Sequence, residues 1–151
     1  MADEADLSGK DVIPCTPNRV LIVDDERTIR EIFMQVLKFG LKDCRLDMAV
    51  NGLEALEMFR QVHHSVILMD LRMPVMDGRE AFDEMRRHCR EHKWEMPAVI
   101  FCTGYAPPHE VGNIVSGNPR HCVLQKPVDN ETLIEALQTR LKIGSSPGLT
   151  V

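Results

Sequence analysis

The chain has 151 residues, 44% of them hydrophobic and 27% charged, which is enough apolar material for one globular domain and excludes a disordered chain. Its formal net charge of -5, without blocks of Lys or Arg, argues against a nucleic-acid surface on this domain. No apolar run reaches the roughly 20 residues that span a bilayer, and the acidic N-terminus (MADEADLSGKD) is unlike a secretory signal, so we expect a cytoplasmic protein with no membrane insertion.

In the first half of the chain, apolar runs alternate with amphipathic stretches. Residues 20–23 (VLIV) predict a short buried strand, and the apolar residues at helical spacing from Ile29 to Leu37 predict a helix that ends at Gly40. Apolar residues then alternate along residues 46–50, which is typical of an edge strand. Asn51 is expected to cap a second helix.

The second half repeats this order. Residues 66–69 (VILM) predict a strand that ends at Asp70, and Asp77 with Glu80 resembles a capping box for the third helix. Residues 98–102 predict the fourth strand. Residues 109–116 predict a weak helix, because two prolines precede it and a glycine lies inside it. Residues 122–125 predict the fifth strand, and Asp129 is expected to cap the last helix.

Five strands that alternate with five helices predict an α/β fold, in which right-handed crossovers build a parallel sheet covered on both faces. We expect this domain at residues 18–142, with flexible extensions at residues 1–17 and 143–151 that are too short for an output domain. The five cysteines contain no C-x-x-C motif and are expected to be reduced thiols.

Reactive side chains follow four of the five predicted strands. Because parallel strands present their carboxyl ends at the ligand-binding edge of such a sheet, these side chains are expected to converge. Clustered carboxylates repel one another unless a cation lies among them, and Mg2+ takes oxygen ligands. A carboxylate beside such a metal can attack phosphorus while an ammonium and a hydroxyl hold the phosphoryl oxygens, so the pattern favours phosphoryl capture. The residues are Asp24, Asp25, Asp70, Thr103 and Lys126.

These side chains lie in four segments that resemble the response-regulator receiver domains of two-component signalling: VLIVDDE, ILMDLRMPVMDG, VIFCTGY and VLQKP. The resemblance covers about Arg19 to Lys142. It implies a flavodoxin-like, doubly wound (βα)5 sheet with strand order 2-1-3-4-5. It also implies that a histidine kinase or phosphotransfer protein phosphorylates Asp70, and that the Lys126–Pro127 peptide bond is cis.

The same resemblance implies the roles of the other site residues. Mg2+, or Mn2+, would be bound by Asp24, Asp25, Asp70 and the Arg72 backbone carbonyl, while Thr103 and Lys126 would bind the phosphoryl group. The implied protein is a signalling switch and no metabolic enzyme: it catalyses only its own phosphotransfer and dephosphorylation, and it controls an unidentified protein partner as a monomer or weak dimer. It departs from the family at Val123, where members usually carry an aromatic switch residue.

Other functions fit the sequence less well. A phosphatase or phosphomutase that forms an aspartyl phosphate needs a second acid two residues after the first, where this chain has Arg72. A flavodoxin-like cofactor binder needs a phosphate loop rich in hydroxyl groups and glycine after its first strand, where this chain has DDERT. Two alternatives stay open: a degenerate receiver that acts as a phosphorylation-independent interaction module, and a receiver fragment of a larger regulator with an output domain.

Overall fold

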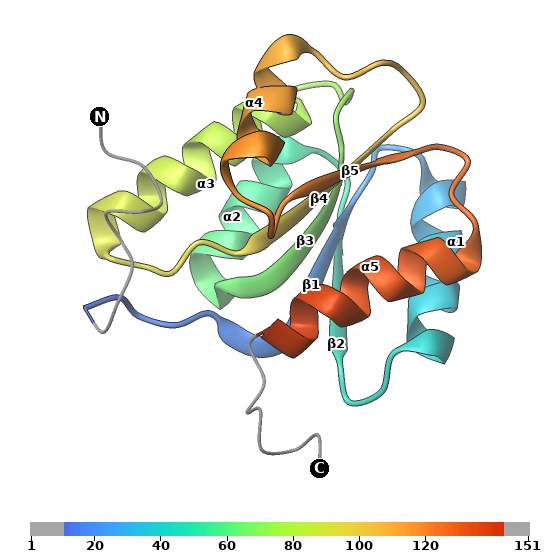
Figure 1. The fold of residues 1–151 in the computed structure, drawn as a ribbon, viewed down its shortest axis with the longest axis horizontal. Helices are drawn as coiled ribbons and strands as arrows, with labels where there is room; N and C mark the ends of the chain where they lie inside the picture. The colour runs from blue at the N-terminus through green and yellow to red at the C-terminus, as the bar shows by residue number, and fades with distance from the viewer. Residues whose placement is uncertain (1–10, 144–151) are drawn as a thin grey trace.

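The computed structural model describes residues 11–143, with side chains to residue 141, and shows one five-stranded parallel sheet with helices on both faces (Figure 1). The strand order is β2-β1-β3-β4-β5, which confirms the predicted topology. The elements in chain order are β1 (Thr16–Val23), α1 (Arg27–Gly40), β2 (Arg45–Ala49), α2 (Gly52–Val62), β3 (His64–Asp70), α3 (Gly78–His92), β4 (Ala98–Thr103), α4 (His109–Gly117), β5 (Cys122–Gln125) and α5 (Asn130–Ile143).

The sheet separates two apolar layers, because successive strand side chains point to opposite faces. Leu21 and Ile67 belong to the layer that α2, α3 and α4 cover, whereas Val20 and Val66 belong to the layer under α1 and α5. All four side chains are fully buried, as the continuous apolar runs predict for inner parallel strands. Burial of each such side chain contributes about 1.5–3 kcal/mol to folding, so these two layers hold the strand ends in place.

Helix α1 ends where the sequence predicts, but for a different reason. Gly40 is the last helical residue, and the capping position is taken by Leu41 in an extended conformation. A side chain at Gly40 would overlap Ile134 of α5, since an added Cβ would lie 2.4 Å from Ile134 Cδ1. Gly40 therefore lets α1 and α5 approach closely without displacement of the Ile134 side chain, and a left-handed helix stop is not its role.

Strand β1 begins earlier than residues 20–23 predict. The Thr16 N–H donates to the His63 carbonyl oxygen (2.8 Å), and the register between β1 and β3 is irregular between Thr16 and Val20. Ahead of the strand, Ile13 forms a parallel bridge with Trp94. Part of the expected N-terminal extension at residues 1–17 is thus attached to the domain. Residues 1–10, and residues 144–151 of the expected C-terminal tail, lie outside the described residues.

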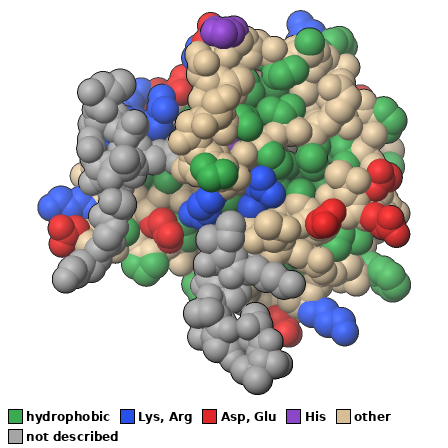
Figure 2. Space-filling view, viewed as in Figure 1, with side chains coloured by type: hydrophobic (Ala, Val, Ile, Leu, Met, Phe, Trp, Pro, Cys, Tyr) green, Lys and Arg blue, Asp and Glu red, His purple; other side chains and the backbone are tan. Residues whose placement is uncertain are grey.

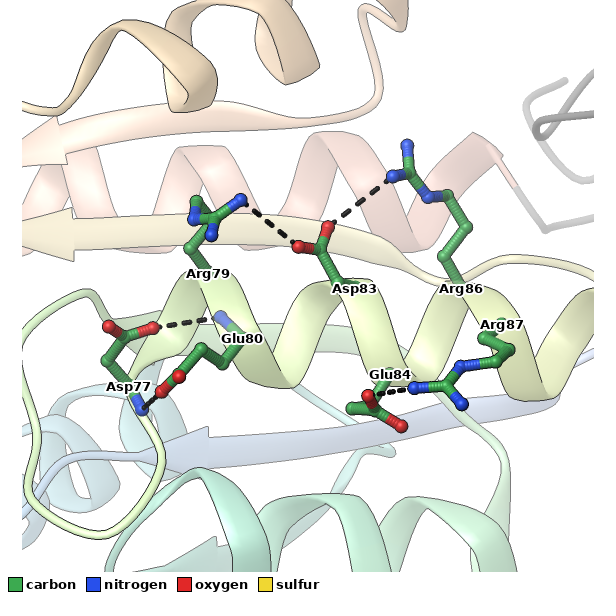
Figure 3. Close-up of polar contacts among 7 residues, drawn as sticks. All are labelled: Asp77, Arg79, Glu80, Asp83, Glu84, Arg86 and Arg87. Atoms are coloured by element: carbon green, nitrogen blue, oxygen red, sulfur yellow. Dashed lines mark hydrogen bonds and ion pairs between the residues drawn. The ribbon is translucent and has the colours of Figure 1, made fainter. Parts of the chain in front are cut away.

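Helix α3 is held at its start by the predicted capping box (Figure 3). The Asp77 carboxylate accepts from the Glu80 N–H (2.8 Å), and the Glu80 carboxylate accepts from the Asp77 N–H (3.0 Å). Further along, Asp83 lies between two guanidinium groups, 3.2 Å from Arg79 and 3.4 Å from Arg86. The capping box fixes the point where the loop after Asp70 enters the helix.

The predicted weakness of α4 is visible in its packing. Val111 is its buried residue, and the helix begins after Pro108 without a side-chain cap.

The Lys126–Pro127 peptide bond is cis, as the family resemblance implies. None of the five cysteines, all within the described chain, forms a disulfide.

Several large hydrophobic side chains are exposed. On the face drawn in Figure 2, hydrophobic side chains reach the surface over the upper right part, and acidic side chains lie mainly toward the two sides. Ile32 of α1, one of the apolar residues at helical spacing between Ile29 and Leu37, is 47% exposed. Four others lie in or beside loops at the carboxyl ends of the strands: Val50, Leu53, Val75 and Tyr105.

A partly buried chain of polar side chains joins β1, β2 and β3. Asp47 accepts from Arg19 Nε (3.0 Å) and contacts Nε2 of the fully buried His64 (2.8 Å). Burial lowers the pKa of His64, and the neighbouring Asp47 carboxylate opposes that shift only in part. The imidazole therefore stays neutral in the folded protein at pH values where it would be protonated in water.

Acidification is expected to destabilise the fold through His64. Below about pH 6.5 the unfolded chain binds a proton at this residue that the folded chain does not, so the free energy of unfolding falls as the pH drops. In denaturant titrations between about pH 7.5 and 5.5, His64→Asn should lose less stability than the parent protein, whereas His109→Asn at an exposed position should match the parent. Equal pH dependence in all three proteins would contradict this assignment.

Candidate functional site

The carboxyl edge of the sheet brings together all five side chains predicted to converge there. Asp24 and Asp25 follow β1, Asp70 and Thr103 are the last residues of β3 and β4, and Lys126 follows β5. Asp24 and Thr103 are each 1% exposed and Asp70 is 8% exposed, whereas Asp25 is exposed. Single carboxylate oxygens of the three aspartates lie within 4.8 Å of one another.

Lys126 is the cation that partly balances these acids. Its Nζ lies 2.8 Å from Asp24 Oδ2 and 3.4 Å from Asp70 Oδ2, although β4 separates its strand from β3. The Lys126 N–H donates to the Thr103 carbonyl oxygen (2.8 Å), which fixes where the lysine side chain begins. One ammonium thus contacts two of the three carboxylates, and the third, Asp25, faces solvent.

The two buried carboxylates also accept backbone hydrogen bonds. Asp24 Oδ1 accepts from the Glu26 N–H (2.9 Å), and Asp70 Oδ1 accepts a longer bond from the Arg72 N–H (3.4 Å). The Arg30 guanidinium donates to the Asp24 carbonyl oxygen (2.8 Å). The sequence does not predict the contact of Arg30 with the Asp24 carbonyl oxygen. A basic residue in the first turn of a helix has no sequence pattern that indicates a hydrogen bond to the preceding loop.

The charges of the site shift two pKa values. Burial raises the pKa of Asp70, and Asp24 raises it further, while Lys126 and the Arg72 N–H oppose the rise. Burial lowers the pKa of Lys126, but its hydrogen bond to Asp24 and the charges of Asp24 and Asp70 outweigh burial, so the pKa of Lys126 is raised. The site therefore keeps its lysine charged and makes ionisation of Asp70 costly unless a cation is near.

Gly78 lets the loop after Asp70 turn tightly beneath the site. A Cβ at this position would lie 2.3 Å from the Asp70 carbonyl oxygen, and the Gly78 N–H donates to the Leu71 carbonyl oxygen (3.0 Å). The sequence indicates only that Asp77 is part of a capping box. The close backbone approach depends on tertiary packing, which no local pattern reports.

A pocket of about 280 Å³ opens beside Thr103. Arg72 and Tyr105 form part of its wall, and the Arg72 guanidinium carbon lies 4.4 Å from the centre of the Tyr105 ring, a cation–π contact. The Thr103 hydroxyl oxygen accepts from the Tyr105 N–H (3.1 Å), which leaves its own hydrogen available to donate. This edge of the sheet thus presents carboxylates, one ammonium and one hydroxyl beside an open pocket.

Comparison with known proteins identifies the family. The sequence pattern described as "Response regulator receiver domain" matches residues 20–138. The chain belongs to this family. The resemblance that the four motifs indicated is thereby confirmed, and the chain is a receiver domain of two-component signalling.

Individual relatives agree with this assignment. This receiver domain is 27% identical over 120 residues to the chemotaxis protein CheY of Halobacterium salinarum, covering 79% of this chain and 92% of that one. It is 44% identical over 89 residues to the regulatory protein AtoC of Escherichia coli, but those residues are 59% of this chain and 18% of AtoC. The receiver domain thus matches only a small part of the larger relatives.

Solved structures share the fold of this receiver domain. A CheY-like receiver domain protein from Methanospirillum hungatei superposes with a TM-score of 0.70 at 24% identity, covering 85% of this chain and 96% of that one. The chemotaxis response regulator CheY4 of Vibrio cholerae gives 0.67 at 28% identity, covering 83% and 99%. Within residues 11–143, no helix is both long and apolar enough to cross a membrane.

Replacing Lys126 by Met should raise the pKa of Asp70 further, because the ammonium that favours the carboxylate is removed while burial and the Asp24 charge persist. Carbon-13 NMR titration of the aspartate carboxyl carbons in Mg2+-free buffer measures this shift, and Asp70→Asn identifies the signal. Lys38→Met, on the far end of α1, should leave that signal unchanged. A pKa of Asp70 that is equal or lower in Lys126→Met would refute the proposed pairing.

Proposed function

We propose that this receiver domain takes a phosphoryl group onto Asp70 from a phosphohistidine of a histidine kinase or phosphotransfer protein. The observation that carries the proposal is the position of the Asp70 carboxylate, at the end of a buried strand between two further acids and one lysine. A carboxylate that served only as a turn former or helix cap would not need a lysine from a strand two places away. Support also comes from the family, whose members act in two-component signalling.

The transfer uses Asp70 as the nucleophile. One carboxylate oxygen attacks phosphorus, the new O–P bond forms as the P–N bond to the donor histidine breaks, and the electron pair of that bond leaves with the imidazole. Lys126, already 3.4 Å from Asp70 Oδ2, then pairs with a phosphoryl oxygen, and the Thr103 hydroxyl donates to another. Removal of the phosphoryl group by water reverses the modification.

The donor set of the site fits a hard divalent cation. Three carboxylates offer oxygen atoms within 4.8 Å of one another, and Mg2+ and Mn2+ prefer oxygen ligands. We assign this role to Asp24, Asp25 and Asp70, with the Arg72 backbone carbonyl as a further ligand. When bound, the cation neutralises charge on the carboxylates and on the transferred phosphoryl oxygens.

The signal leaves the site through Thr103 and the segment after it. Thr103 begins the exposed loop that leads into α4, the helix with one buried residue, so this segment needs little free energy to move. When the Thr103 hydroxyl turns toward the phosphoryl group, the loop moves with it. A protein partner then binds the altered surface of α4, β5 and α5. Family members usually carry an aromatic switch residue where this chain has Val123. The conformational change proposed here therefore depends on Thr103 and the loop that follows it.

The phosphodonor approaches a partly apolar rim. Val75 and Tyr105 are 74% and 60% exposed, and both lie in loops at the carboxyl edge. Exposed apolar patches next to polar groups mark protein docking surfaces, and aromatic side chains are enriched at such interfaces. The extensions outside the expected domain at residues 18–142 are assigned no part in this reaction.

Asp70→Asn should abolish phosphate uptake, because an amide oxygen is a poor nucleophile. Intact-mass measurement after treatment with a small acyl-phosphate donor should show one added phosphate on the parent protein only with Mg2+ present, and none on Asp70→Asn. Asp83→Asn, a surface acid on α3, should behave like the parent protein. Normal phosphate uptake by Asp70→Asn would overturn the assignment.

The lifetime of the phosphoryl group depends on the path of the attacking water. Arg72 and Tyr105 contact each other beside the site, 4.4 Å from guanidinium carbon to ring centre, and so cover one approach. Neither side chain is a short amide or an acid that would orient a water for in-line attack. Slow self-dephosphorylation is the consequence.

Replacement of both covering residues should shorten this lifetime. At fixed Mg2+, Arg72→Asn and Tyr105→Glu should each lose phosphate faster than the parent protein, and the double variant fastest, by about tenfold or more for a barrier lowered by about 1.4 kcal/mol. Phosphate loss is followed by intact mass after removal of the donor. If the double variant is no faster than the parent, the two side chains do not control hydrolysis.

A further inference from the structure

Two cysteine thiols meet at the edge of the sheet opposite the phosphoacceptor. Cys15 Sγ lies 3.4 Å from the carbonyl oxygen of Glu95, and Cys89 Sγ lies 3.8 Å from the same oxygen. Because both distances end on the same oxygen, the two sulfur atoms lie no farther apart than the sum of 3.4 Å and 3.8 Å, although 74 positions separate the residues in sequence. His63 Nε2 also lies 2.8 Å from this oxygen.

The segment that carries Cys15 is held at this place by the backbone. The Ile13 N–H donates to the Lys93 carbonyl oxygen (2.7 Å), and the Glu95 N–H donates to the Ile13 carbonyl oxygen (2.8 Å). The Cys15 N–H donates to the Glu95 carboxylate (3.0 Å). Cys15 thus stays beside the last turn of α3, where Cys89 is fully buried.

Burial and the Glu95 carboxylate raise the pKa of the Cys15 thiol, and the neighbouring Cys89 contributes to the rise. The Cys15 thiol therefore stays protonated and slow to react while the segment is in place. The segment is attached through an isolated β-bridge at Ile13, whose side chain is exposed. Segments with so few buried contacts open locally at low cost in free energy. Opening exposes Cys15 first, since Cys89 lies deeper.

We propose that Cys15 and Cys89 form a reversible disulfide under peroxide stress. The Cys15 thiolate attacks one oxygen of hydrogen peroxide and becomes a sulfenic acid, and the other oxygen leaves in the first water molecule. The Cys89 sulfur then attacks the Cys15 sulfur, and the sulfenic oxygen leaves as the second water. Two thiols lose two hydrogen atoms in total, and a dithiol reductant restores them.

The disulfide fastens the entry to β1 onto α3. It closes a long loop of chain, which restricts the unfolded state and raises stability. The bond forms at the amino ends of the strands, whereas Asp70 lies at their carboxyl ends. This inference is independent of the proposed phosphorylation, and phosphate uptake should be the same in the oxidised and reduced proteins.

The test compares the parent protein with Cys15→Ser, Cys89→Ser and the control Cys44→Ser, whose cysteine packs under the other face of the sheet. Each reduced protein is treated with hydrogen peroxide, its remaining thiols are blocked in denaturant, and its peptides are analysed by mass spectrometry. The parent and Cys44→Ser should yield a peptide pair joined through Cys15 and Cys89, with a melting temperature raised by about 5 °C or more. Dithiothreitol should reverse both changes.

Cys15→Ser and Cys89→Ser should show neither the linked peptides nor the rise in melting temperature. Because the parent protein itself gives the linked peptides, the test holds even if a variant folds poorly. A different pair, such as Cys102 with Cys122, would overturn the proposal. So would exclusive linkage between molecules, or oxidation to sulfinic acid without any disulfide.

Discussion

The contact of the Lys126 ammonium with both Asp24 and Asp70 is the interaction on which the site depends. Two carboxylates that are almost fully buried cannot both stay ionised side by side without a positive charge, and removal of one partner from a buried ion pair costs about 3–5 kcal/mol. Lys126 meets that need only in part, since Asp25 completes a group of three acids. The remaining negative charge is the basis of the proposed binding of a divalent cation and a phosphoryl group.

Strand order explains how these groups meet. β1 and β3 are neighbours, so Asp24 and Asp70 end adjacent strands, and the crossovers that produce the order 2-1-3-4-5 bring acids from residues 24 and 70 together. Lys126 follows β5, two strands away from β3, and its ammonium still lies 3.4 Å from Asp70 Oδ2. Cys15 and Cys89 lie at the other end of the strands, the amino end, away from the site around Asp70.

The sequence predicts the strands and helices, which follow from the spacing of apolar residues, and the residues of the site, which follow from the residue types at the strand ends. The apolar runs at residues 20–23, 66–69 and 98–102 predict buried strands, and the five reactive side chains after four of the strands indicate one edge of the sheet. It could not predict that Gly40 admits Ile134, that Ile32 faces solvent, or that Cys15 and Cys89 share the Glu95 carbonyl oxygen. Those features depend on how separate elements pack, and local patterns carry no information about such distant neighbours.

The most direct measurement of the central claim is chemical trapping of the acyl phosphate. Borohydride reduces an aspartyl phosphate to homoserine, so peptide mass spectrometry identifies the phosphorylated residue in the unaltered protein. After incubation with a phosphorylated histidine kinase or an acyl-phosphate donor and Mg2+, homoserine should be found at position 70 and should be absent when the cation is chelated. Homoserine at another aspartate, or at position 70 without any divalent cation, would contradict the account of the site.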